Sequence, residues 1–387
     1  MVRTFSYFLL LISTAVFSQG IAFNELPPAE VFQLAQTQKK PVFYMFYATW
    51  CSHCNKMKKE VLVDSKVAEF YNENFVCAWQ DMEKGDTKLL GKKYGAKSYP
   101  TFAVIDGNGE LLYSFAGEFE AAAFIKEGQQ ALIETNQFPY LKKQFYSDLS
   151  NANKCYAYVA ALRKSNLETN AEARLYLSKV PESVLVSDIN WKIIANGIRD
   201  IRSREFQFVL KNQDEFAKVA SAKRVERKIL NVVTEELQPF VQLSDTLNYN
   251  KQRVASAAIG LPKTDSLVYK FDRTILESTK NWTKLHQVNL ASIQSMWKYP
   301  SEITSIVSVY EKNINDEKAL KQAIVWQEQA AENKPSKENY LLLSKLNLKV
   351  RDRKKANYWA EKARDISIQY GWSTKEADEM IQQIKSL

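Results

Sequence analysis

Two cysteines separated by two residues, Cys51 and Cys54, are the side chains in this sequence best suited to chemistry. They stand in the segment Trp50-Cys51-Ser52-His53-Cys54, directly after an apolar run. A thiolate can attack a disulfide to form a mixed disulfide, and a second thiol one helical turn away can displace it. The spacing therefore predicts a thiol–disulfide exchange site in which Cys51 attacks and Cys54 resolves.

Two other uses of this cysteine spacing are open from the residues alone. Structural zinc sites need four ligands, but the chain has only two histidines, His53 and His286, and no second pair of cysteines with this spacing. A purely structural disulfide is the other alternative. We expect a redox-active pair, with no metal site and no bound cofactor.

The residues around Cys51 are expected to activate it. Asn55 to Leu62 have helical character, so Cys51 would lie at a helix N-terminus, where unpaired amides favour an anion. That setting raises the thiolate fraction of a cysteine. An imidazole at His53 would stabilise the thiolate further and make the disulfide more oxidising, whereas a histidine that faces solvent would have little effect.

Helices and strands alternate through the segment that must position this pair. Continuous apolar runs rich in β-formers predict buried strands, and Asp106-Gly107-Asn108-Gly109 predicts a hairpin turn. The expected elements are a helix from Pro28 to about Gln38, strands at 42–48, 75–79 and 101–105, a helix at 86–94, a returning strand at 110–115 and a closing helix at 119–132. This order predicts an α/β fold with a mixed central sheet flanked by helices.

Residues 24–133 resemble the thioredoxin family. Its first signature is a strand that leads into Trp50-Cys51-x-x-Cys54 at a helix start, and its second is Tyr99-Pro100-Thr101 at the entry of a later strand. The resemblance implies a thioredoxin-like fold in which Pro100 is cis and lies against the cysteine pair. It also implies that backbone groups of Tyr99 pair with a bound peptide strand and that Trp50 shields the site.

One position departs from the family. Thioredoxins carry a buried aspartate six residues before the first cysteine, where this chain has Met45. Glu60, on the predicted helix that follows Cys54, could take the place of this aspartate, although a surface position is expected for it. Cys77 lies in a predicted strand and is expected to be an inert core residue, and spacing offers no support for its pairing with Cys155.

The N-terminal segment predicts export. Arg3 precedes an apolar run from Phe5 to Phe17, which small or polar residues follow through Gly20. The run is shorter than the roughly 20 residues of a spanning helix, so a signal peptide at residues 1–20 is favoured over a membrane anchor. We expect a periplasmic or secreted protein with no stable membrane span after cleavage.

Composition changes after the predicted thioredoxin-like domain, which we place at residues 21–135. Residues 23–131 carry a net charge of −2 and no arginine, whereas residues 132–387 carry +10. Helical patterns with almost no glycine predict an all-α domain at 136–387. Its basic residues are spread among acidic ones, so we expect no nucleic-acid partner.

An internal repeat lies near residues 318–370. Ala323, Trp326, Glu328 and Ala330 recur, all 33 positions later, as Ala356, Trp359, Glu361 and Ala363. Small residues seven apart let two helices pack closely, and the period resembles the tetratricopeptide repeat. The repeat predicts a helical domain able to hold a peptide or protein partner.

Two functions follow from these patterns. The first is an exported thiol–disulfide oxidoreductase that exchanges dithiols and disulfides with protein substrates and is reset by a redox partner. The alternative is an interaction protein whose helical repeats bind a partner, while the thioredoxin-like domain senses or holds that partner without turnover.

Overall fold

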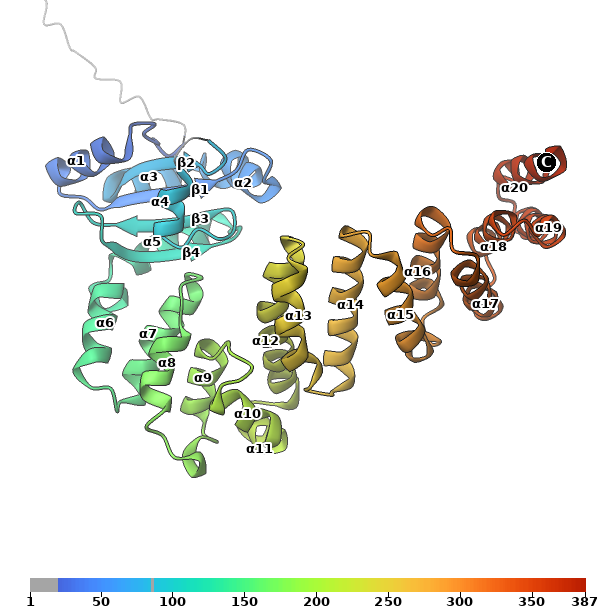
Figure 1. Cartoon of the computed structure of the whole chain (residues 1–387). Coiled ribbons are helices and arrows are strands. Elements are labelled where there is room, and N and C mark those ends of the chain that lie inside the picture. Colours follow the sequence, from blue (N-terminus) through green and yellow to red (C-terminus); the bar gives the residue numbers. More distant parts are fainter. Residues whose placement is uncertain (1–19, 85–86) are drawn as a thin grey trace, which may run out of the picture. The chain divides into compact units, whose positions relative to one another are not determined.

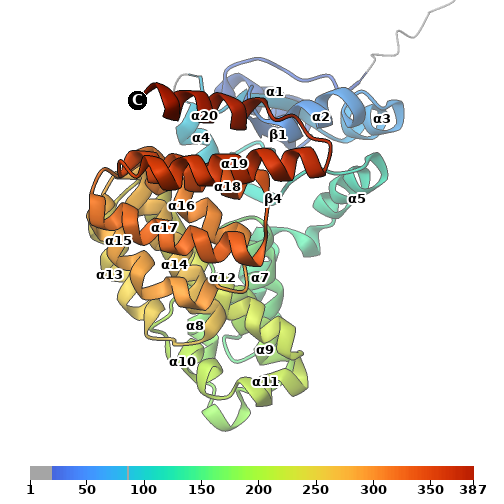
Figure 2. The ribbon, with the colours of Figure 1, turned by 90° about the vertical axis from the view of Figure 1, so that its right-hand side faces the viewer.

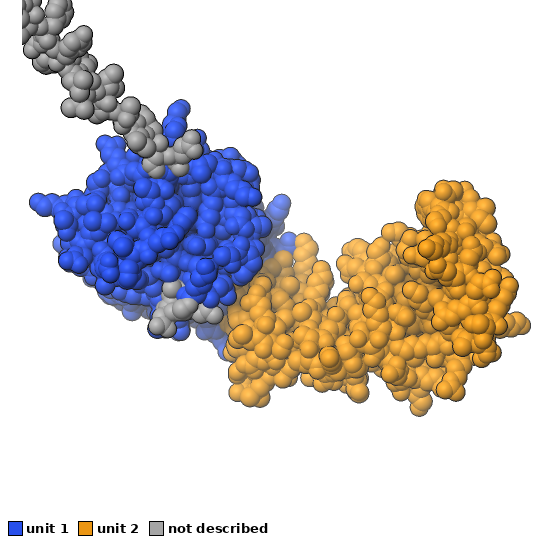
Figure 3. All heavy atoms as spheres, turned by 90° about the horizontal axis from the view of Figure 1, so that it is seen from above, with its two compact units in different colours: residues 1–228 blue, residues 229–387 orange. Residues whose placement is uncertain are grey.

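The computed structural model describes residues 20–84 and 87–387, so nearly all of the predicted signal peptide lies outside the described residues. The chain forms two compact units, Met1–Lys228 and Ile229–Leu387 (Figure 3). The domain boundary expected between residues 135 and 136 falls inside the first unit and stays a prediction.

A four-stranded mixed sheet lies in the first unit, among helices α1 to α5 (Figure 1). Its strands are β1 (Val42–Tyr47), β2 (Val76–Asp81), β3 (Thr101–Ile105) and β4 (Leu111–Ala116), in the spatial order β2-β1-β3-β4. β1 runs parallel to β2 and antiparallel to β3, and β3 and β4 form an antiparallel pair. The predicted mixed sheet and hairpin are confirmed.

The continuous apolar run of β1 belongs to a strand that is covered on both faces. Phe43 and Met45 point into a core shared with η1 (Met57–Val61), α3 (Ser65–Asn74) and α5 (Ala121–Leu132). Val42, Tyr44 and Phe46 point into the opposite core, against α1 (Pro28–Gln38) and α4 (Thr87–Lys93). The two cores make a three-layer α/β domain, as the sequence predicts.

Helix α3 is an element that was not predicted from the sequence, in which residues 63–74 were given neither a helix nor a strand. Asp64 caps this helix by accepting hydrogen bonds from the amides of Lys66 and Val67, at 2.9 and 3.1 Å. Val67 and Tyr71 are buried at helical spacing. The N-cap residue and this apolar pattern are the two signals that identify the helix.

Residues 134–387 all lie in the described part of the chain, and every regular element there is a helix. These are η2 (Glu134–Asn136), α6 (Phe138–Ser147), α7 (Ala152–Lys164), α8 (Asn170–Leu177), η3 (Glu182–Val184), α9 (Asp188–Gly197), α10 (Arg204–Lys211), α11 (Gln213–Val219), α12 (Ala222–Gln242), α13 (Thr246–Ala257), α14 (Pro262–Ser278), α15 (Trp282–Ser292), η4 (Ile293–Met296), α16 (Pro300–Asn313), α17 (Glu317–Asn333), α18 (Lys337–Lys349), α19 (Arg353–Gln369) and α20 (Lys375–Ser386). The all-α region is confirmed. No helix in the described ranges is long and apolar enough to cross a bilayer.

The predicted repeat lies on corresponding helices, α17 and α19, in the second unit. Its four alanines (Ala323, Ala330, Ala356 and Ala363) are fully buried. α18 packs between α17 and α19, where the Ser344 hydroxyl donates to the Ala356 carbonyl oxygen at 2.8 Å (Figure 2). The close helix packing expected from small residues is present, and the resemblance to tetratricopeptide repeats stays a prediction.

Candidate active site

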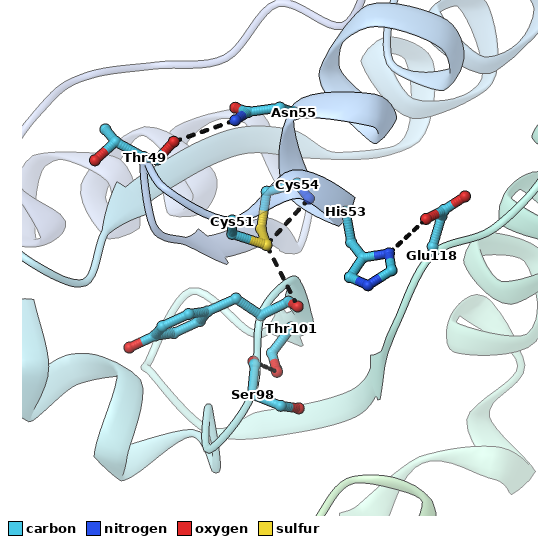
Figure 4. The surroundings of a disulfide bond; sticks show 9 residues. Thr49, Cys51, His53, Cys54, Asn55, Ser98, Thr101 and Glu118 are labelled. Carbon is cyan, nitrogen blue, oxygen red and sulfur yellow. Dashed lines mark hydrogen bonds and ion pairs between the residues drawn. A yellow bond between two sulfur atoms is a disulfide. The ribbon is translucent and has the colours of Figure 1, made fainter. Parts of the chain in front are cut away.

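Cys51 and Cys54 form a disulfide at the start of α2 (Ser52–Lys56), with their Cα atoms 5.3 Å apart (Figure 4). Cys51 is the N-cap residue of this helix, and its Sγ accepts a hydrogen bond from the Cys54 amide at 3.1 Å. Cys51 is 5% exposed, whereas Cys54 is fully buried. Cys51 is therefore the more exposed of the two cysteines, and it lies where a helix favours a thiolate.

The turn before β3 lies directly against this disulfide. The Tyr99–Pro100 peptide bond is cis, as the resemblance implied. The Tyr99 carbonyl oxygen is 3.5 Å from Cys51 Sγ, and Pro100 is buried. A hydrogen bond of 3.0 Å from the Gly117 amide to the Pro100 carbonyl ties this turn to the end of β4.

Trp50 flanks the cysteine pair but leaves most of its own side chain in solvent. It is 70% exposed, and its ring makes an edge-to-face contact with Tyr99 at a centroid distance of 6.0 Å. This position forms an apolar wall beside Cys51. The predicted shielding role of Trp50 stays a prediction.

His53 points toward the carboxylate of Glu118, a residue that was not predicted to belong to the site. Its Nδ1 lies 2.7 Å from Oε2 of Glu118 (Figure 4). Lys56 pairs with the other carboxylate oxygen of Glu118. Two hydrogen bonds lower the pKa of Glu118 below its usual value; the bond from Lys56 has the larger effect and the bond from His53 the smaller. His53 and Glu118 are 65 positions apart, so only the folded chain brings them together.

This arrangement predicts the effect of Glu118→Gln. The substitution removes one negative charge near the cysteine pair and releases Lys56 from its partner. Both changes favour a thiolate, so we expect the reduced form to gain roughly two- to fivefold in the thiol–disulfide equilibrium, the scale of surface charge pairs. A glutathione titration of both proteins measures this. An unchanged or more reducing potential would contradict it, and Glu134→Gln is a matched control on an exposed acid.

The buried acid expected in a thioredoxin is absent from the Met45 position. Met45 is fully buried in the same core cluster as both cysteines, and Glu60 is exposed. A different carboxylate is buried nearby in the sheet: Asp81 is 5% exposed and lies at the end of β2, in register with Tyr47. Asp81 was missed because an acid at the end of an apolar strand is indistinguishable from a loop residue in sequence.

The side chain of Lys58 packs on two aromatic rings, those of Tyr47 in β1 and Trp79 in β2. Lys58 Nζ lies 3.1 Å from the centroid of the Tyr47 ring and 4.6 Å from that of Trp79. Burial lowers the pKa of Lys58, and Asp81 opposes this effect. Lys58 belongs to η1, so this contact fixes the active-site helix against the ends of β1 and β2.

The other two cysteines are free and buried, so they form no bond with each other. Burial raises the pKa of the Cys155 thiol to about 12, and it also raises that of Cys77. A buried thiol with a raised pKa is a poor nucleophile. Both residues therefore have the character of core residues, as expected for Cys77.

Comparison with known proteins agrees with this fold. A family model described as a thioredoxin-like domain matches residues 28–132. Protein disulfide-isomerase 1 of Dictyostelium discoideum is 34% identical over 67 residues, which are 17% of this chain and 18% of that protein. The chloroplastic thioredoxin Y of Oryza sativa subsp. japonica is 31% identical over 100 residues, which are 26% of this chain and 56% of that protein.

A solved structure matches part of the chain. It is a candidate disulphide-isomerase from Bacteroides thetaiotaomicron, 37% identical, and the match spans 30% of this chain and 95% of that one with a TM-score of 0.28. This chain spans only a fifth or so of the disulfide-isomerases that it matches. Residues 28–132 are a thioredoxin-like domain, and the relatives that match it are named as disulfide isomerases or a thioredoxin.

Proposed function

We propose that the thioredoxin-like domain of this chain catalyses thiol–disulfide exchange with protein substrates through Cys51 and Cys54. The observation that carries the proposal is the disulfide at the N-terminus of α2, with Cys51 the more exposed sulfur. The relatives named as disulfide isomerases support the same class of reaction.

In the reducing direction, the Cys51 thiolate attacks one sulfur of a substrate disulfide and releases the other as a thiolate. Cys54 then loses its proton and attacks Cys51 Sγ, which frees the second substrate thiolate and leaves the Cys51–Cys54 disulfide. Two electrons pass to the substrate. The oxidising direction is the reverse sequence, and no further cofactor takes part.

Residues beside the disulfide have separate roles in this proposal. Tyr99 and Pro100 present the backbone against which an extended substrate lies, Trp50 forms a wall of that surface, and His53 tunes the stability of the thiolate. A redox partner protein resets the cysteine pair after each turnover.

Export and partner binding are the parts of the proposal that depend on the sequence. The apolar N-terminal segment supports a periplasmic or secreted location. The repeat on α17 and α19 supports a helical region that resembles tetratricopeptide repeats and holds a client or partner.

The deciding experiment is a titration of the full chain in glutathione buffers, followed by thiol alkylation. We expect one two-electron transition that belongs to Cys51 and Cys54. A potential near roughly −120 to −180 mV would indicate an oxidant or isomerase, and one near roughly −270 mV a reductase. A pair that does not titrate would refute the proposal and favour the interaction protein that holds a partner without turnover.

A further inference from the structure

The corner between α7 and α8, residues Lys164–Glu168, packs against the edge of the sheet. The Ser165 hydroxyl donates a hydrogen bond of 2.8 Å to the Ser114 carbonyl oxygen, and both residues are buried. Because β4 is an edge strand, its outward carbonyl groups have no neighbouring strand to supply a donor. Figure 1 shows α6 and α7 next to β4.

A second contact anchors the same corner to α5. Lys164 Nζ lies 2.6 Å from the Tyr113 hydroxyl and 2.6 Å from Oε2 of Glu127. Tyr113 in turn donates to Glu127 at 2.9 Å. Three side chains from β4, α5 and α7 thus form one charge-assisted network.

The corner also meets the segment Gly95–Pro100, which we name the proline segment. Gly95 is buried and has a φ of 76°. A Cβ atom at this position would lie 2.8 Å from Cδ2 of Leu167 and 3.1 Å from the Ser165 carbonyl oxygen. The backbone conformation favours glycine at this position, and Gly95, the first residue of the proline segment, lies directly against Leu167 and Ser165.

The corner is held firmly from its other side. The Thr169 hydroxyl donates to the Gly197 carbonyl oxygen in α9 at 2.9 Å, and Thr169 is fully buried. The Leu167 amide donates to the Leu162 carbonyl oxygen at 3.0 Å. Leu167 is half-buried, and these bonds tie its backbone and that of Thr169 to α7 and α9.

We propose that the α7–α8 corner holds the proline segment in register for an extended peptide, so that Leu167 and Ser165 are positioning residues for peptide disulfides. The inference rests on the proposed exchange function. The proline segment carries the Tyr99 carbonyl group 3.5 Å from Cys51 Sγ. A shift of this segment changes the backbone that a peptide strand pairs with, while Cys51 and Cys54 stay on α2. The first helices after the sheet therefore take part in substrate choice.

The test compares two substrates in the full chain. One is an extended peptide that carries a mixed disulfide with glutathione, and the other is hydroxyethyl disulfide, which is too small to pair with the proline segment. For Leu167→Ala we expect KM for the peptide to rise roughly three- to tenfold, the cost of about one weakened hydrogen bond, with kcat within twofold. We expect the rate with hydroxyethyl disulfide and the reduction potential to match the wild type.

Control variants separate positioning from folding. Leu175→Ala removes a leucine of 39% exposure from α8. We expect it to leave KM and kcat unchanged for both substrates. Leu167→Met should restore the peptide KM. If Leu167→Ala does not fold, Ser165→Ala takes its place in the test, and we expect it to raise KM for the peptide but not to change the rate with hydroxyethyl disulfide. Equal effects on the two substrates, or none on the peptide, would overturn the inference, whereas wild-type protein that turns over neither substrate would overturn the proposed function itself.

Discussion

Cys51→Ser is expected to abolish exchange, with a fall in turnover of about a thousandfold or more, because the nucleophile is lost outright. Cys54→Ser is expected to behave differently. It keeps the accessible sulfur of Cys51 but removes the buried thiol that completes the reaction. Substrate should therefore accumulate on Cys51 as a mixed disulfide. Mass spectrometry of alkylated, unreduced protein after incubation with an oxidised peptide measures both outcomes.

Cys54→Ser is expected to trap a mixed disulfide with the substrate, whereas Cys51→Ser is expected to trap none. The N-cap position gives only Cys51 the helix amides, and Cys54 is shielded by the core around Met45 and Met57. Cys155→Ala is the matched control, because this thiol is free and fully buried in α7, which carries neither cysteine of the disulfide. Equal trapping by Cys51→Ser and Cys54→Ser would show that the attacking sulfur has been misassigned.

Local patterns were sufficient to predict most of the sheet domain. The run at 42–48 has no polar residue to mark an exposed face until its end, so it had to be a strand covered on both sides. The turn at 106–109 has the composition of a hairpin, and β3 and β4 flank it in the structure. Cys51 and Cys54 could be assigned from spacing, since four residues of one helix start contain the whole pair.

The remaining parts of the site depend on contacts between distant residues. Glu118 follows β4 and is ordinary in sequence, yet it becomes the partner of His53 and Lys56. Its position depends on where the chain leaves β4, next to the turn before β3, where the Gly117 amide donates to the Pro100 carbonyl oxygen. The expectation that His53 acts directly on Cys51 did not consider this acid, and the effect of His53 on the thiolate stays a prediction.

The contact between the sheet and the α7–α8 corner also could not be predicted from sequence patterns. Charge and composition change after residue 131, which favours a separate domain. Leu167 and Ser165 nevertheless pack on Gly95 and Ser114. Packing of this kind depends on the shape of two surfaces, and neither leucine spacing nor helix propensity encodes it.

Phe43→Ala is expected to cost about 3–5 kcal/mol in the free energy of unfolding of the sheet domain, as for other large aromatic residues removed from a core. Phe43 is fully buried on the central strand. Its ring lies within 4.5 to 6.4 Å, centroid to centroid, of five others: Tyr71, Phe75, Phe102, Phe115 and Phe124. These rings come from β3, β4, α3 and α5 and the residue before β2, so no single neighbour can move to fill the cavity.

Hydrogen exchange of the β1 and β3 amides in the full chain measures this loss locally, without assuming that both units unfold together. Val63→Ala, at a position 49% exposed, is the control and should change the exchange free energy by less than about 0.5 kcal/mol. A loss below about 1 kcal/mol for Phe43→Ala would mean that the core is not packed as described.

Because the cysteine pair lies in the same core cluster as Phe43, Phe43→Ala should also make Cys54 react faster with an alkylating reagent in the reduced protein. An increase in Cys54 alkylation without faster exchange at β1 would place the disturbance at the active site alone, and would contradict a single core that supports both.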